Sequence, residues 1–116
     1  MAKDFQQITR DITQGIVEIR RTRPQVMEGF NKLSSAAMED GALDKKSKEL
    51  IALAIGVATH CDGCIGFHTG ALARLGASRE EVMDALAVSV YMGGGPSLMY
   101  ASEAIQAFDQ FAAKDD

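Results

Sequence analysis

The sequence has no tryptophan, only two prolines and two cysteines among its 116 residues, and aromatic side chains make up 6% of it. Two cysteines are too few for a disulfide-rich secreted scaffold. The longest apolar run, 50–58, is shorter than the ~20 residues that a helix needs to cross a bilayer. The N-terminal segment also has no apolar stretch of the kind that a secretory signal contains. These absences predict a cytoplasmic protein without a membrane span.

A large excess of charge of one sign is also absent. The chain carries 12 basic and 16 acidic side chains, so its formal net charge is −4. A mildly acidic chain without a long basic run is not expected to bind nucleic acid or an anionic membrane surface. Because a chain of 116 residues can build only one hydrophobic core, we predict a single domain over residues 1–116.

Apolar residues are present, and they recur at helical spacing almost throughout the chain. Helices are expected from about residue 5 to a break at 22–24, from Pro24 to a stop near Gly41, and over about 45–59 and 61–75. A capping box at 78–81 opens a fifth helix, and a sixth runs from Pro96 to about Ala113. No segment alternates with period two. We therefore predict an all-α domain of five to seven helices.

Several of these predicted helices are apolar on more than one face. The segment from Leu50 to Ala58 is apolar all round, so we expect it to be buried on every side. Such a small chain cannot easily cover all of this surface, and exposed apolar patches usually mark contacts with partners. Since self-association is the commonest solution for a small protein, we predict a homo-oligomer.

Cys61 and Cys64 lie three residues apart, where the fourth predicted helix begins. In a reducing compartment such a pair is more often catalytic or metal-binding than structural. A helix N-terminus favours the thiolate, and by this argument alone Cys61 would be the more acidic thiol. His68 follows Cys64 by four residues, so its side chain shares their helix face and leans toward the cysteines. An imidazole there can take up or return a thiol proton at neutral pH.

Glu49 is the fourth candidate site residue. If the third predicted helix folds back on the fourth, Glu49 lies roughly 16 Å and His68 roughly 10 Å from the turn between them. A carboxylate–imidazole contact is then within reach if the helices lean, and it would orient the imidazole and stabilise its cation. The alternative is that Glu49 is an ordinary exposed charge among the neighbouring lysines at 45, 46 and 48.

Together these residues read E-x11-C-x2-C-x3-H, from Glu49 through Cys61-Asp62-Gly63-Cys64 to His68. This pattern resembles the core motif of the alkylhydroperoxidase D-like (AhpD-like) branch of the carboxymuconolactone decarboxylase family. The resemblance covers about residues 25–110 and is strongest over 45–100. It implies an all-α, AhpD-like fold, and members of the family are commonly trimers or hexamers, so we expect a homotrimer or a homohexamer.

The resemblance also implies a chemistry, that of an antioxidant thiol peroxidase of the peroxiredoxin type. Cys64 would attack the peroxide and become a sulfenic acid, and Cys61 would resolve it to a disulfide. Glu49 and His68 would form a proton relay to the thiols. A dithiol reductant, lipoyl-type or thioredoxin-like, would recycle the disulfide, and neither a cofactor nor a metal is expected.

Other interpretations stay open. Alkylhydroperoxidase D has a second histidine between its cysteines, where this chain has Gly63, and this favours a disulfide reductase with little peroxidase activity. Alternatively, His60, Cys61, Cys64 and His68 could supply four zinc ligands in a non-enzymatic redox-sensing or zinc-holding oligomer. Because His60 and Cys61 are adjacent, that site would have to straddle the helix break. Outside a zinc site, His60 is interpreted as structural or as part of the site wall.

Overall fold

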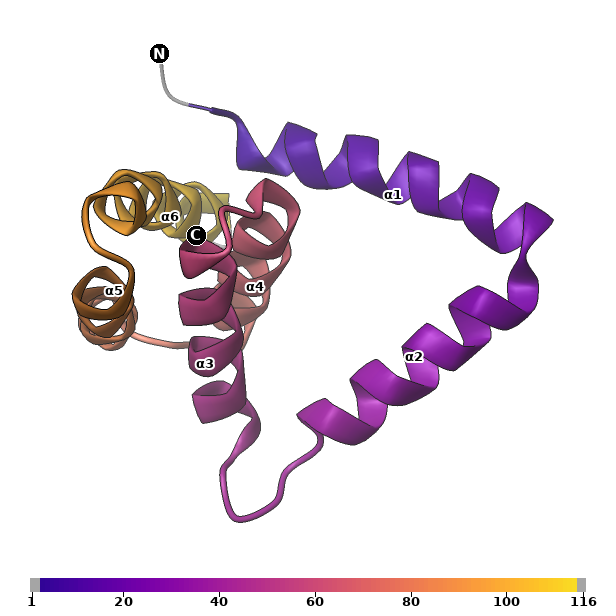
Figure 1. Cartoon of the computed structure of the whole chain (residues 1–116), viewed down its shortest axis with the longest axis horizontal. Helices are drawn as coiled ribbons and strands as arrows, with labels where there is room; N and C mark the ends of the chain where they lie inside the picture. Colours follow the sequence, from indigo (N-terminus) through magenta and orange to yellow (C-terminus); the bar gives the residue numbers. More distant parts are fainter. Residues whose placement is uncertain (1–2, 115–116) are drawn as a thin grey trace.

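The computed structural model describes residues 3–114, which form helices joined by short connections (Figure 1). The prediction of an all-α domain with five to seven helices is confirmed, and the described residues include no strand. None of the helices in this part of the chain is both long and apolar enough to cross a membrane. The six helices are α1 (Phe5–Thr22), α2 (Pro24–Met38), α3 (Lys45–Ala58), α4 (Asp62–Arg74), α5 (Arg79–Gly93) and α6 (Gly95–Lys114).

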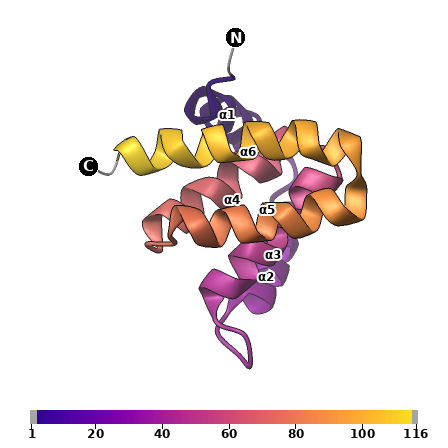
Figure 2. The same ribbon diagram turned by 90° about the vertical axis from the view of Figure 1, so that its left-hand side faces the viewer.

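Helices α3 to α6 pack together, with α4 against both α3 and α6. Helices α5 and α6 lie side by side and antiparallel (Figure 2). The core of the protein lies inside this group, and the first turn of α1 closes it with the fully buried ring of Phe5. The largest fully buried apolar side chains are Phe5, Leu53, Ile65, Leu72, Val57 and Val82.

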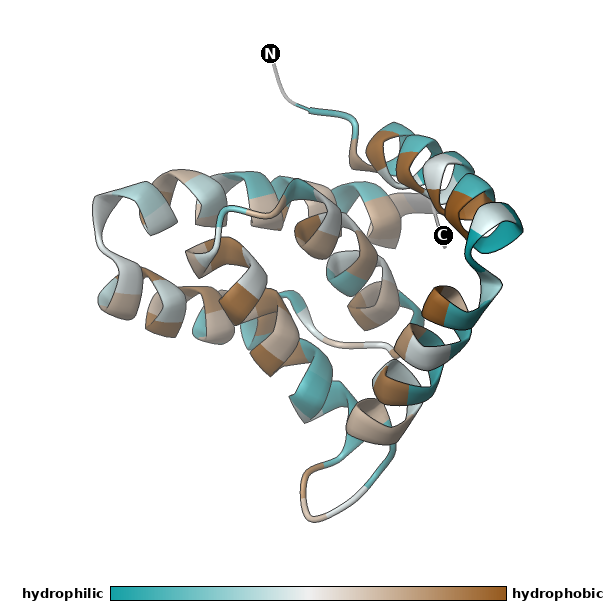
Figure 3. Ribbon diagram, turned by 45° about the vertical axis from the view of Figure 1, so that its right-hand side comes forward, coloured by the Kyte–Doolittle hydropathy of each residue, from teal (hydrophilic) through white to brown (hydrophobic). Residues whose placement is uncertain are grey.

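Helices α1 and α2 form an open V, of which the C-terminal half of α1 and most of α2 extend away from this group (Figure 1). The N-terminal half of α1 packs on α4, because Thr9 and Ile12 lie against the glycines at 66 and 63. Apolar residues continue along both helices of the V, where Figure 3 shows them in brown. Exposed large apolar side chains of the V include Val17, Ile19, Val26, Phe30 and Leu33.

Most of the signals that end and begin helices act as predicted, but the stop expected near Gly41 does not, because α2 ends at Met38 with Glu39 as its C-cap. Pro24 occupies the first turn of α2, and Ser78 and Glu81 form the capping box at the start of α5. Gly76 and Gly94 have φ values of +76° and +72°, which glycine adopts without steric cost, and they follow the ends of α4 and α5. Local rules therefore set most of the helix boundaries.

The prediction that 50–58 is buried on every face is wrong for this chain. Leu53 and Val57 are fully buried, but Ile51 and Ile55 are 48% and 57% exposed on the opposite side of α3. The group α4–α6 covers one face of α3, and α2 reaches only its N-terminal end, so the outer apolar face stays open. Composition predicts how much apolar surface a helix has, but not how many neighbours pack around it.

Candidate active site

The site is built on the tight connection between α3 and α4. Helix α3 ends in a Schellman motif, in which the His60 N–H donates to the Val57 carbonyl at 3.1 Å and the Cys61 N–H to the Gly56 carbonyl at 2.9 Å. Cys61 is at the same time the N-cap of α4, which begins at Asp62 rather than at Cys61. Cys61 thus ends the turn after α3 and starts α4. Its backbone is therefore held by hydrogen bonds to both helices.

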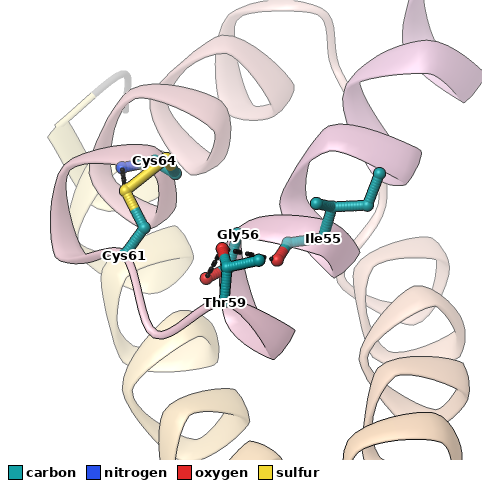
Figure 4. Close-up of a disulfide and its surroundings, with 5 residues drawn as sticks. All are labelled: Ile55, Gly56, Thr59, Cys61 and Cys64. Carbon is teal, nitrogen blue, oxygen red and sulfur yellow. Dashed lines mark hydrogen bonds between the residues drawn. A yellow bond between two sulfur atoms is a disulfide. The ribbon is translucent and has the colours of Figure 1, made fainter.

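The sulfurs of Cys61 and Cys64 are bonded to one another at this connection (Figure 4). Their Cα atoms are 5.2 Å apart, within the usual range for a disulfide. The Cys64 N–H donates to Cys61 Sγ at 3.1 Å, so the N-terminal sulfur takes the capping position of α4. Beside the pair, the Thr59 hydroxyl donates to the carbonyls of Ile55 and Gly56, as Figure 4 shows. Both cysteines are half-buried.

Two glycines let neighbouring helices approach the cysteines closely. A Cβ atom at Gly56 would lie 2.8 Å from Cys64 Cβ, so α3 packs against the second cysteine at a distance that only glycine permits. A Cβ atom at Gly63, between the cysteines, would lie 2.9 Å from Ile12 Cδ1 of α1. The sequence alone did not indicate a role for Gly56, because a glycine is needed there only for a contact with another helix.

Glu49 and His68 meet across the interface between α3 and α4. His68 Nδ1 lies 2.6 Å from Glu49 Oε2, a short contact typical of a charge-assisted hydrogen bond. The Glu49 side chain is only 8% exposed, whereas that of His68 is 30% exposed. Since Glu49 engages Nδ1, the Nε2 atom of the ring is the nitrogen that can exchange protons elsewhere. The alternative of an ordinary exposed charge at Glu49 is wrong, because the residue is buried.

A hollow of about 290 Å³ between α2 and α3 is lined in part by Glu49. Its remaining lining is mostly polar and includes Ser35 and Lys45. Glu49 therefore contacts His68 and also borders this hollow. A larger hollow of about 640 Å³ lies along the α1–α2 V, between Arg20 and Glu39, and its lining contains none of the cysteines or their neighbours.

A second group of side chains surrounds the first residues of α4. The His60 ring stacks on the Tyr100 ring of α6, with centroids 4.6 Å apart and planes inclined by 4°. Lys3 Nζ lies 5.5 Å from the centroid of the same tyrosine and donates to Asp62 and Glu103 at 2.9 and 3.0 Å. These hydrogen bonds, to Asp62 first and then Glu103, raise the pKa of Lys3. Sequence reasoning assigned no role to Tyr100, since no spacing rule links positions so far apart in the chain.

The structure therefore places the four sequence-predicted site residues on the adjoining helices α3 and α4 and the connection between them, as two contacting pairs. Cys61 is bonded to Cys64, and Glu49 contacts His68, one turn beyond Cys64 on α4. Zinc would need more ligands converging on one point, and within residues 3–114 no group of three or more histidine, cysteine, aspartate or glutamate side chains is arranged to hold a metal ion. The arrangement suits thiol–disulfide chemistry with a nearby acid–base pair.

The sequence and the fold of this chain are similar to those of several known proteins. The sequence pattern of the carboxymuconolactone decarboxylase family matches residues 24–107. An uncharacterized protein of Cupriavidus necator is 40% identical over 113 residues, which cover 91% of this chain and all of that protein. The crystal structure of apo-lpg0406, a family member from Legionella pneumophila, superposes with a TM-score of 0.92 at 56% identity, covering 93% of this chain and 96% of the other.

A more distant solved relative carries a functional suggestion. The Thermotoga maritima family member TM1620, for which involvement in an antioxidative response has been suggested, superposes with a TM-score of 0.78 at 28% identity. The superposition covers 97% of this chain and 93% of that protein. The fold of this chain is thus shared over nearly its whole length with both solved proteins.

Proposed function

The chain belongs to the carboxymuconolactone decarboxylase family, and we propose that it acts there as a thiol-dependent peroxidase of the alkylhydroperoxidase type. The observation that carries this proposal is the Glu49–His68 contact of 2.6 Å beside a bonded Cys61–Cys64 pair. A redox pair alone would serve many thiol functions. A buried carboxylate that orients an imidazole next to that pair adds a means of moving protons during the reaction.

The proposed reaction begins with the reduced pair. The Cys64 thiolate attacks one oxygen of a hydroperoxide, the O–O bond breaks, and the alkoxide leaves as an alcohol after it takes up a proton. The Cys61 thiolate then attacks the sulfenic sulfur of Cys64, and hydroxide leaves as water after it takes up a proton. A dithiol reductant, lipoyl-type or thioredoxin-like and supplied by the cytoplasm, returns two electrons and two protons to the bridge.

The two cysteines would have their thiolates stabilised in different ways. Cys61 Sγ accepts a hydrogen bond from the Cys64 N–H at the start of α4, where backbone donors favour a negative charge. Cys64 lies one helical turn before His68. Cys61 would therefore stay ionised through the helix terminus and act as the resolving thiolate, while Cys64 would depend on the imidazole. The helix terminus alone would favour Cys61 as the attacking thiolate, and the assignment of that step to Cys64 rests on the family resemblance.

His68 and Glu49 would form the proton relay. His68 would take the proton of the Cys64 thiol and return protons to the departing alkoxide and hydroxide. Glu49 would hold the ring and stabilise the imidazolium formed in between. The polar hollow that Glu49 borders would connect this carboxylate to solvent.

A second function is favoured by one observation, the close packing at Gly63. A Cβ atom at Gly63 would lie 2.9 Å from the flexible end of the Ile12 side chain, so α1 lies against the position where alkylhydroperoxidase D carries its second histidine. A site without that histidine suits reduction of protein or small-molecule disulfides, with little turnover of peroxides. Thiol–disulfide exchange with a model disulfide, measured without peroxide, separates this activity from peroxidase activity.

The test is peroxide consumption by the reduced protein with a dithiol donor. Cys64→Ser should abolish turnover, and His68→Ala and Glu49→Gln should each lower it by about 10²-fold or more. Glu18→Gln is the matched control, because Glu18 is an exposed glutamate of α1 paired with Arg21. Turnover that stays unchanged in both relay variants would remove Glu49 and His68 from the mechanism.

Metal analysis of protein purified without a chelator tests the remaining alternative. A preparation that contains stoichiometric zinc and consumes no peroxide would support a non-enzymatic zinc-holding or redox-sensing oligomer. A metal-free preparation in which one equivalent of hydroperoxide converts the two thiols to the Cys61–Cys64 bridge, detected by mass spectrometry, would support the peroxidase.

A further inference from the structure

Two helices of this chain end in the same hydrogen-bonding motif, but with different residues at its critical position. At the end of α4, Gly76 and Ala77 donate to Ala73 and Leu72 at 3.2 and 3.0 Å. At the end of α3, His60 and Cys61 donate to Val57 and Gly56 at 3.1 and 2.9 Å. The first residue of each pair has a left-handed backbone, with φ of +76° at Gly76 and +58° at His60.

Glycine is the usual residue at this position, because a side chain there disfavours positive φ. His60 is the one non-glycine residue with positive φ in the described part of the chain. Conformations of this kind cost of order 1 kcal/mol or more, and they persist only where the surroundings hold them in place. The surroundings of His60 therefore need to supply a contact that glycine would not make.

That contact is the stack of the His60 ring on Tyr100. The rings are nearly parallel, and Tyr100 belongs to α6, which is packed in the core. On the other side of Cys61, Lys3 links Asp62 at the start of α4 to Glu103 of α6. The connection that carries Cys61 is thus tied to α6 on both sides of the cysteine.

None of these contacts involves sulfur. The Schellman hydrogen bonds, the ring stack and the Lys3 bridge all remain possible when the Cys61–Cys64 bond is broken. A dithiol whose backbone stays in place loses little conformational freedom when its bridge closes, so its sulfurs have a high effective concentration relative to each other. A loosely held connection would lose more conformational freedom, and its disulfide would form less readily.

We propose that His60 is a positioning residue of the redox site, and that its stack on Tyr100 holds Cys61 in place so that the bridge to Cys64 closes readily. The proposal rests on the proposed function only in taking Cys61 and Cys64 as a working redox pair. The stack acts through the backbone of Cys61 and takes no part in proton transfer.

The experiment measures the equilibrium of the pair with a buffer of reduced and oxidised dithiothreitol, without peroxide. Two protein thiols and one buffer disulfide give the Cys61–Cys64 bridge and two buffer thiols, so atoms and electrons balance. His60→Gly relieves the steric cost of positive φ but removes the ring, and Tyr100→Leu removes its partner. Each should lower the equilibrium constant for bridge formation about tenfold, or raise the potential of this two-electron couple by about 30 mV.

Two further variants separate positioning from general stability. Tyr100→Phe keeps a ring under His60 and should restore the equilibrium constant to within about twofold of the wild type. Tyr91→Leu makes the same change as Tyr100→Leu at an exposed tyrosine of α5 and should leave the constant unchanged. The double variant His60→Gly, Tyr100→Leu should lower the constant no further than either single variant, because both remove one contact.

The proposal is overturned if the equilibrium constants of His60→Gly and Tyr100→Leu equal that of the wild type while only their melting temperatures change. It is also overturned if the two effects add in the double variant. Since no peroxide is present, a failure of the proposed peroxidase leaves this measurement intact. Conversely, an active peroxidase with unshifted constants would refute the positioning role alone.

Discussion

The two halves of the molecule use similar apolar residues in opposite ways. In the group α3–α6, the apolar side chains Leu53, Val57 and Leu72 are fully buried against neighbouring helices. In the V of α1 and α2, side chains of the same kind, such as Phe30 and Leu33, are more than 60% exposed. The first half builds a core within one chain, although it also leaves apolar side chains such as Ile55 and Met92 exposed, whereas the second half leaves an apolar stripe and adds little to the core beyond Phe5.

The candidate active site belongs to the half that contains the core. Its four residues come from α3, α4 and the connection between them, and α6 supports that connection through Tyr100. The V contributes through Ile12 and Thr9 of α1, which pack on α4, and through α2 residues such as Ser35 that line the hollow at Glu49. The stripe of the V leads us to propose that a second copy of the chain covers it, in the predicted homotrimer or homohexamer. Four predictions test how different the two halves are.

The largest expected difference is between Leu53→Ala and Leu33→Ala. Leu53 is fully buried in α3, so its truncation should lower the free energy of unfolding by about 2–5 kcal/mol. Leu33 is 65% exposed on α2, so the same change in the monomer should cost less than about 0.5 kcal/mol. Urea unfolding of both variants at low protein concentration measures the two values. Equal losses would contradict the comparison.

The next prediction is that a Gly→Ala substitution changes the stability in opposite directions in the two halves. Gly56→Ala would place a methyl group 2.8 Å from Cys64 Cβ, so it should destabilise the protein by about 1–3 kcal/mol. Gly29→Ala in α2 meets no atom within 4 Å and improves helix propensity, so it should stabilise by about 0.5–1 kcal/mol. Thermal unfolding of both variants decides the signs, and destabilisation by Gly29→Ala would show that α2 is closely packed in solution.

The third prediction concerns the exposed stripe itself. If a second copy covers the V, Leu33→Glu should place a charge in that contact and weaken self-association about tenfold or more, equivalent to about 1.4 kcal/mol. Sedimentation velocity over a range of protein concentrations measures this. Lys32→Glu, one residue away in an exposed pair with Glu28, is the control for a new negative charge on α2. A wild-type chain that stays monomeric would refute the proposed oligomer.

How far the sequence predicted the molecule depends on how local each feature is. Pro24, Gly76 and the capping box at Ser78 act within a few residues, and the helix boundaries follow from them. The grouping of Cys61, Cys64 and His68 also follows from helical spacing, since all three lie on or next to one helix. The contact between Glu49 and His68 needs two helices to fold back on one another, so helical rise made it possible, and the family resemblance favoured it over an exposed Glu49.

Features that depend on packing between distant segments were not predicted. The exposed face of α3 at Ile51 and Ile55 depends on how many helices surround it, which apolar spacing does not specify. The stack of His60 on Tyr100 joins residues forty positions apart. The presence of a histidine or a tyrosine in the sequence does not predict such a contact. Likewise, Gly56 resembles any helix glycine until Cys64 is seen against it.

The smallest expected effect lies where the two halves join, at the N-cap of α3. The Asp44 carboxylate accepts a hydrogen bond from the Ser47 N–H at 2.8 Å, and the hydrogen bonds with Ser47 lower the pKa of Asp44 below its ordinary value of 3.8. A carboxyl group whose pKa is lower in the folded state stabilises that state above the ordinary pKa. The stabilisation is lost as the pH falls through the folded value.

Asp44→Asn keeps an acceptor oxygen at the cap but removes the charge. The wild type should therefore melt a few degrees above the variant at pH 7 and at pH 5, and the gap should narrow at a third pH well below the ordinary pKa of 3.8. Melting curves followed by circular dichroism at the three pH values measure it, with Asp84→Asn, an exposed aspartate within α5, as the control. If the gap at the lowest pH equalled that at pH 7, the charge of Asp44 would contribute nothing, and the cap would stabilise the start of α3 through its hydrogen bond alone.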